Sequence, residues 1–164
     1  MPEPVTPVTK EDLLRYIPLK REIEVRQERI VRMRSHEQYP EMHDASESQH
    51  VASATDSTAK AIEARLEYTD TTDQLIAQNW AEIRRIETAV DALSNPLERQ
   101  VILLRYMSAE FCRMPLWSAI AMRMYGNDDR NQVLSCFRLH KTALANLLCP
   151  DPSLDKIDQV KIQD

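Results

Sequence analysis

The side chains best suited to chemistry in this chain are hydrogen-bonding groups gathered near its C-terminal end. They lie within twelve positions that a helix would place largely on one outward face, and they are Arg130, Asn131, Gln132, Ser135, Arg138 and Lys141. Arginine can donate two parallel hydrogen bonds to guanine, and asparagine or glutamine can pair in the same way with adenine. This stretch therefore has the chemistry needed to contact base edges in duplex DNA.

Some basic residues of this region are better suited to phosphates than to bases. Phosphate contacts fix the position of a protein on DNA without selecting a sequence, and we assign that role to Arg105, Arg123, Arg138 and Lys141. The competing interpretation is an ordinary solvated helix face. Between Leu97 and Leu148 there are seven Lys or Arg against four Asp or Glu, on a chain of net charge −5. Because phosphate neutralisation supplies most non-specific affinity, this small excess leaves DNA binding open.

Two helices separated by a short polar turn would position the outward face. Residues 117–124 and 130–147 have helical apolar spacing, and Gly126 between them is the only glycine of the chain. A turn that needs positive φ prefers glycine because no Cβ obstructs it. We therefore expect a helix-turn-helix. Its inner faces are predicted to be Ile120, Ala121 and Met124 on the first helix, and Val133 or Cys136 with Leu139, Ala143 and Leu147 on the second.

Other polar and aromatic side chains of this region have structural interpretations. Asp128 and Asp129 precede the second helix, where acidic residues cap the free N–H groups and favour the helix dipole. His140 lies beside the predicted inner face, and we expect it to be half-buried and hydrogen-bonded. Trp117 is expected to pack in the core against Tyr106 rather than to serve as a platform for base stacking.

The first third of the chain predicts one long charged helix between two irregular segments. Residues 1–9 hold three prolines and are expected to be a disordered lead-in. Thr9 and Asp12 have the spacing of a capping pair, which would begin a helix over residues 10–35. Residues 36–56 are polar and contain a proline, so we interpret them as a linker.

A second long helix is predicted over residues 57–93. Its apolar positions recur every seven residues, with a polar interruption, at Ile62, Thr69, Ile76, Ile83 and Val90. A helix so thinly apolar needs a partner stripe. The first helix could supply it as an antiparallel hairpin, and a second copy of the chain could supply it as a homodimer. The sequence leaves both alternatives open.

The predicted C-terminal domain covers residues 94–149, followed by a tail over residues 150–164. Ser94 or Asn95 is expected to cap its first helix, with Pro96 at the first helical position, where the missing N–H costs nothing. The predicted fold is thus all-α: long N-terminal helices, as a hairpin or a coiled coil, followed by a small helix-turn-helix domain.

Enzymatic, metal-binding and membrane functions have no support in the sequence. There is no Gly-rich phosphate loop and no HExxH or GxSxG motif, so we expect no enzyme and no cofactor. The three cysteines form no CxxC pair, and three histidines of the linker (His36, His43 and His50) are interpreted as solvated residues, so we expect no metal. No run approaches the ~20 apolar residues of a membrane span, and a cytoplasmic location is expected.

Three motifs in order resemble those of ArpU/RinA-type phage late-transcription regulators, and more broadly the C-terminal helix-turn-helix of bacterial sigma factors. The residues that match the family pattern are Pro96, Glu98, Arg99, Val101, Leu104, Arg105 and Tyr106, then Trp117, Ile120 and Ala121, then Arg138, His140, Ala143 and Leu144. The resemblance implies a transcription regulator, encoded by a phage or prophage and acting in the cytoplasm of a bacterial host. It would bind double-stranded DNA and use its long helices to dimerise or to contact RNA polymerase.

The chain departs from the family pattern at the turn. The family commonly has Y-S-x-R-x-V at the start of the recognition helix, whereas this chain has YGNDDRNQV, with two additional acids. Two alternatives of a different class therefore stay open. One is a helical adaptor that binds RNA polymerase or a sigma factor without contacting DNA. The other is a phage DNA-packaging adaptor.

Overall fold

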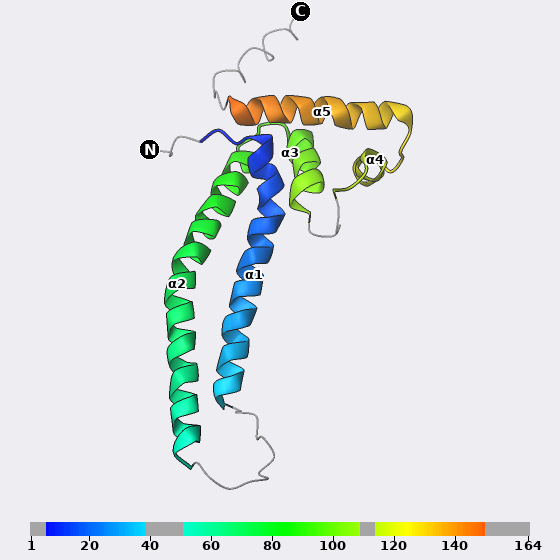
Figure 1. Ribbon diagram of the computed structural model, residues 1–164. Helices are drawn as coiled ribbons and strands as arrows, with labels where there is room; N and C mark the ends of the chain where they lie inside the picture. Colours follow the sequence, from blue (N-terminus) through cyan, green and yellow to red (C-terminus); the bar gives the residue numbers. More distant parts are fainter. Residues whose placement is uncertain (1–5, 39–50, 109–113, 150–164) are drawn as a thin grey trace, which may run out of the picture. The chain divides into compact units, whose positions relative to one another are not determined.

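Helices make up the whole of the regular structure in the described residues, which are 6–38, 51–108 and 114–149 of a computed structural model. No β-strand occurs within those ranges, so the predicted all-α fold is confirmed. The elements are α1 (Lys10–Gln38), α2 (Val51–Asp91), α3 (Pro96–Ile102), the π-helical turn η1 (Leu103–Met107), α4 (Trp117–Tyr125) and α5 (Arg130–Leu148) (Figure 1).

The two long helices extend beyond their predicted limits. α1 continues to Gln38 and α2 begins at Val51, so both ends of the predicted 36–56 linker are helical. Residues 51–56 contain neither glycine nor proline, and the cost of Ser, Thr and Asp in a helix is well below 1 kcal/mol each. Polarity alone was therefore a poor signal for a linker. The remainder of the linker and the predicted tail lie outside the described residues.

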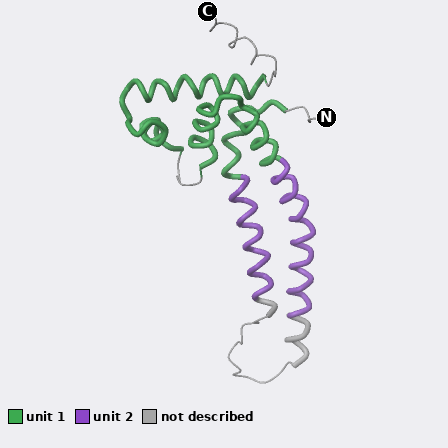
Figure 2. The backbone as a smooth tube through the Cα atoms, turned by 180° about the vertical axis from the view of Figure 1, so that it is seen from behind, with its two compact units in different colours: residues 1–18, 82–164 green, residues 19–81 purple. Residues whose placement is uncertain are grey.

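The chain divides into two compact units, drawn in different colours in Figure 2. Unit 2, residues 19–81, is an antiparallel pair formed by parts of α1 and α2. Asn79 donates a 3.2 Å hydrogen bond to Glu22, and the Arg29 guanidinium lies 4.4 Å from the Tyr68 ring centre. Leu19, Ile23 and Thr72 are buried in this unit. The hairpin alternative is thus the one seen within a single chain.

Unit 1 joins residues 1–18 to residues 82–164, so it is larger than the domain predicted from residue 94 onward. Val8, Leu13 and Tyr16 are buried in it together with the end of α2. The Val8 N–H donates to the carbonyl of Leu147 at 3.0 Å, and the Tyr16 hydroxyl donates to Glu87 at 2.6 Å. These contacts join residues more than 70 positions apart, which no local sequence pattern indicates.

The start of α1 is held by the predicted capping pair. The Thr9 N–H donates to the Asp12 carboxylate at 2.9 Å, and the Asp12 N–H donates to the Thr9 hydroxyl at 3.2 Å, which confirms the prediction. Arg85 of α2 forms an ion pair with the same carboxylate at 3.1 Å and donates to the Pro7 carbonyl at 2.8 Å. The hydrogen bonds from Thr9, and after them those from Arg85, lower the pKa of Asp12. One side chain of α2 therefore fixes the N-terminal segment.

α3 begins as the sequence predicts, with Asn95 as its cap. The Asn95 side-chain oxygen accepts a 2.9 Å hydrogen bond from the Leu97 N–H, and Pro96 occupies the first helical position. Glu98 is buried, and its carboxylate accepts hydrogen bonds from the side chains of Asn146, at 2.9 Å, and Asn95, at 3.4 Å. Those two bonds compensate part of the cost of removing a carboxylate from water. The bond from Asn146 also links α3 to α5.

We predict that Thr9→Ala destabilises unit 1 by about 1 kcal/mol, because a helix start without its cap leaves N–H groups unpaired. Urea denaturation followed by circular dichroism would measure the change. Thr142→Ala is the matched control, since the Thr142 hydroxyl donates to the Arg138 carbonyl inside α5 and caps no N–H group. Equal losses in both variants would contradict the role given to Thr9.

Candidate nucleic-acid interface

The turn between α4 and α5 is built around Gly126, as the sequence predicts. Gly126 has a φ of 75° in the left-handed region, and its N–H donates to the Met122 carbonyl at 2.9 Å. Nothing lies within 4 Å of the point where a Cβ would stand. A larger residue here would thus suffer from backbone strain rather than from a clash. The glycine allows the chain to leave α4 at Tyr125 and start α5 at Arg130, with four residues between them.

The predicted capping role of the acidic residues at this turn is wrong in its main detail. Asp129 occupies the N-cap position of α5, but its side chain makes no capping hydrogen bond. The Asn127 side chain instead accepts from the Asp129 N–H at 3.2 Å, because a side chain two residues back can reach that donor. Asp128 and Asp129 are both exposed, so their charges lie on the surface beside Arg130.

The predicted inner faces of α4 and α5 meet in a small apolar cluster. Ile120 and Ala121 of α4 and Cys136 of α5 are buried, and Met124 and Val133 pack against them. The small side chains of Ala121 and Cys136 let the two helices approach closely. Burial raises the pKa of the Cys136 thiol, which keeps it protonated. The helix-turn-helix core is therefore confirmed.

The rest of the buried face of α5 packs beyond α4. Ala143 and Leu147 are buried, while Asn146 bonds to Glu98 of α3. In Figure 1, α5 crosses both α3 and α4. Each of these contacts fixes the rotation of α5 about its own axis. The face opposite to them is consequently turned to solvent.

His140 connects α5 to the neighbouring elements, and it is half-buried and hydrogen-bonded as predicted. Its Nε2 atom lies 2.7 Å from the Tyr106 hydroxyl of η1, and its ring meets the edge of Trp117 at 5.0 Å between ring centres. Trp117 also packs on Phe137 at 4.3 Å between ring centres. The described ring contacts of Trp117 are thus with α5, whereas the sequence pointed to Tyr106.

Arg105 does not belong to the outward face, so its prediction as a phosphate contact is corrected. Its guanidinium lies 4.4 Å from the centre of the Trp117 ring and donates to the Pro115 carbonyl. Its Nε atom is buried and has no hydrogen-bond partner, and burial lowers the pKa of the side chain. Arg105 therefore joins η1 to Pro115, just before α4. The residue type alone does not reveal such a packing role.

The remaining predicted contact residues divide by exposure. Arg130, Asn131, Arg138 and Lys141 are exposed along the outward side of α5, and Arg123 is exposed on α4. Ser135 lies on the same side and donates to the Asn131 carbonyl at 2.9 Å, which occupies its hydroxyl proton. Gln132 precedes the buried Cys136 by four residues, so it shares the inward stripe and is half-buried.

Sequence reasoning missed two apolar residues on this outward side. Leu134 is 42% exposed and lies three residues after Asn131 and four before Arg138, so the three share one face. Phe137 is 43% exposed at the edge of that face. An exposed apolar side chain between hydrogen-bonding groups matches the thymine methyl group in the major groove. Leu134 could have been identified from the sequence, because it is an apolar residue at a position that the helical repeat assigns to the solvated face.

Other kinds of site find little support in the described part of the chain. Within it, no three His, Cys, Asp or Glu side chains gather as metal ligands would, and the side chains of His36, His43 and His50 lie outside it. No helix there carries an apolar stretch of the length that a bilayer requires. No protein-family model matches this chain, and neither does any curated protein or solved structure.

We predict that His140 makes unit 1 less stable as the pH falls below about 6.5. Burial, followed by the charges of Arg105 and Lys10, lowers the pKa of His140 below its usual value of 6.5. The unfolded chain then binds more protons than the folded chain, so stability is complete above that pH and declines below it. Urea midpoints at about pH 7.5 and about pH 5 should differ less in His140→Gln, which does not titrate. If the two urea midpoints differ as much in His140→Gln as in the wild type, the role given to His140 is contradicted.

Proposed function

We propose that this protein is a DNA-binding transcription regulator that inserts the outward face of α5 into the major groove. The observation that carries the proposal is that this helix has one buried side and one exposed side. Cys136, Ala143 and Leu147 hold the inner side, while Arg130 and Arg138 project from the other. The resemblance to phage late-transcription regulators supports the same function. It extends the proposal to a phage or prophage origin, a bacterial cytoplasm and contact with RNA polymerase.

The dimensions and side chains of α5 suit this role. Its 19 residues extend about 28 Å, and a groove about 12 Å wide admits one helix. In helix-turn-helix proteins, the N-terminal residues of the second helix contact base edges. Arg130 and Asn131 are those residues here, with Leu134 one turn further on. Arg138 and Lys141 then lie beside the backbone phosphates.

The proposal includes the pairing of two copies of the chain through the long helices. Helix-turn-helix dimers bind two half-sites one helical turn apart, and the second half-site multiplies the specificity of the first. A single helix of this modest positive charge gains little affinity from phosphates alone. Two copies would contribute twice the number of base contacts.

The first test is a binding titration with the preferred duplex, obtained by selection from a random pool, over a range of salt concentrations. Lys141→Ala and Arg138→Ala should each reduce the salt slope by about one and weaken all sequences alike. Arg130→Ala should cost about 1–3 kcal/mol on the selected duplex and less on random DNA.

Arg84→Ala is the matched control, since Arg84 is exposed on α2 in the same unit but lies off α5. It should leave both the salt slope and the selected-site affinity unchanged. Absence of any wild-type affinity above that of a non-specific acidic polymer at low salt would remove the proposed function.

The second test concerns Leu134 and the thymine methyl group. Replacing thymine by uracil at the matching position of the selected duplex should weaken wild-type binding about fourfold, because one buried methyl contributes about 0.8 kcal/mol. The Leu134→Ala variant should bind both duplexes equally. Equal wild-type affinity for every thymine-to-uracil duplex would show that Leu134 contacts no methyl group.

A protein-binding adaptor is the second candidate function. Leu116, which precedes α4, is 74% exposed, and Phe137 on α5 is 43% exposed. Large exposed apolar side chains favour a protein surface as partner, and the net charge of −5 does not favour DNA. Retention of RNA polymerase or a sigma factor by the immobilised protein after nuclease treatment, lost in Leu116→Ser, would favour this adaptor. A ring-sized oligomer would instead favour a packaging adaptor.

A further inference from the structure

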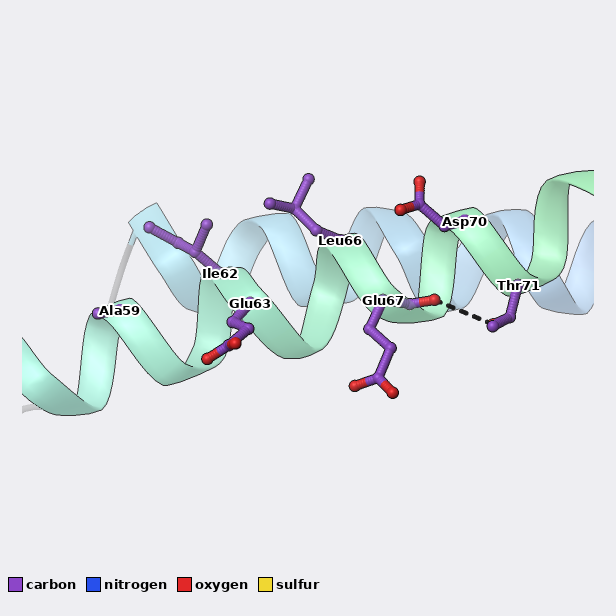
Figure 3. A pocket seen from close by; sticks show the side chains of 7 residues that line it. All are labelled: Ala59, Ile62, Glu63, Leu66, Glu67, Asp70 and Thr71. Atoms are coloured by element: carbon purple, nitrogen blue, oxygen red, sulfur yellow. Dashed lines mark hydrogen bonds between the residues drawn. The ribbon is translucent and has the colours of Figure 1, made fainter.

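A row of apolar side chains on α2 is left uncovered within unit 2. Leu66 is 50% exposed, Trp80 is 41% exposed and Ile62 is 38% exposed. Figure 3 shows an open hollow along this part of α2, whose lining side chains all come from that helix; Ile62 and Leu66 project together on one side of it. Exposed apolar side chains on one side of a charged helix, here with Asp73 between Leu66 and Trp80, favour an interaction surface.

The helical repeat separates this row from the side of α2 that faces α1. Tyr68, Thr72 and Asn79 mark the facing side, because they contact α1 or are buried in unit 2. Leu66 and Trp80 are two heptads apart, so they share a line along the flank of the facing stripe. We call this line the α2 flank. α1 of the same chain leaves it open.

The corresponding flank of α1 differs in character. Starting from the stripe by which each helix faces the other, one can move around either helix in the direction of increasing residue number. In an antiparallel pair, the positions reached in this way on the two helices lie on the same side of the pair. For α1 those positions include Lys20, Gln27 and Arg34, with Val31 beside them. Val31 is 60% exposed, and Arg34 is exposed as well. We call this line the α1 flank.

The two helices of unit 2 carry opposite charge. Residues 19–35 of α1 contain six Lys or Arg and three Glu, whereas residues 58–81 of α2 contain two Lys or Arg and four Asp or Glu. On the flanks themselves, Lys20 and Arg34 belong to α1 and Asp73 belongs to α2, and Glu63 lies beside the α2 flank, three residues before Leu66. A surface that is basic along one edge and acidic along the other is complementary to a copy of itself.

We propose that the partner of this surface is unit 2 of a second copy, with the α1 flank of each copy on the α2 flank of the other. A two-fold axis parallel to the helices gives this pairing, and every neighbouring pair in the resulting four-helix bundle is antiparallel. An axis perpendicular to the helices would bring α2 against α2, and Asp73 and Glu63 would then meet residues of the same charge. Charge therefore selects the parallel axis.

The intrachain contacts fix the level at which the copies meet. Glu22 pairs with Asn79 and Arg29 with Tyr68, so residue numbers at one level of the hairpin sum to about 100. Arg34 is then level with residues 63–67 of α2. With a parallel axis, the two copies share these levels. Arg34 of one copy consequently faces Glu63 and Leu66 of the other.

The test measures the mass of the full-length protein by sedimentation at micromolar concentration. The wild type should be a dimer, and Leu66→Glu should be a monomer with unchanged helix content, because Leu66 is exposed within one chain. Leu75→Glu is the matched control: Leu75 is 41% exposed on α2 but lies nine residues, or two and a half turns, from Leu66 and so on the opposite side. It should stay dimeric. A monomeric wild type, or a dimeric Leu66→Glu, overturns the proposal.

A charge exchange identifies the pairing of α1 with α2. Arg34→Glu should raise the dimer dissociation constant about tenfold by placing like charges together, and adding Glu63→Arg should restore it. Failure of the double variant to recover would overturn this arrangement. The inference rests on the proposed pairing of copies but not on DNA binding. Titration of the monomeric Leu66→Glu variant with random duplex tests DNA binding separately from the pairing of copies, since α5 is intact in that variant.

Discussion

The rotation of α5 about its own axis is the constraint on which unit 1 depends. Its buried stripe consists of Cys136, Ala143 and Leu147, and four neighbouring segments contact α5 along its length. α4 packs at Cys136, η1 reaches His140, α3 bonds to Asn146, and the N-terminal segment bonds to the Leu147 carbonyl. A turn of α5 by one residue would break all four contacts together. The polar side of the helix is therefore held toward solvent by the sum of contacts on the other side.

The aromatic and basic side chains around His140 show how that rotation is kept rigid. Tyr106 fixes the imidazole through its hydroxyl, and Trp117 covers both His140 and Phe137. Arg105 lies over the same tryptophan and bonds to the chain that leads into α4. These contacts link three elements in a chain of direct packing, so loss of the tryptophan would weaken the packing of η1, α4 and α5 together. A helix that contacts base edges needs this rigidity, because side chains on a mobile frame lose entropy on binding.

Local features of the fold were predictable, and long-range ones were not. The Thr9–Asp12 cap, the Asn95–Pro96 start of α3 and the Gly126 turn each depend on residues within four positions, so residue type alone indicates them. The extent of unit 1 depends on contacts such as that of Arg85 with Asp12, which leave no periodic pattern. The same limit explains the errors at the site. Arg105 is basic like Arg138, and only tertiary packing distinguishes a guanidinium on a tryptophan from one in solvent.

The acidic residues of the turn bear on the affinity of α5 for DNA rather than on its specificity. The N-terminus of a helix attracts phosphate, and Asp128 and Asp129 place two negative charges at that end. They weaken attachment to any duplex, whatever its sequence, whereas hydrogen bonds and apolar contacts to base edges depend on sequence. Because this repulsion lowers specific and non-specific affinity alike, the ratio of specific to non-specific binding is set by the contacts with base edges. Under the proposed function, discrimination between DNA sequences is thus left to Arg130, Asn131 and Leu134.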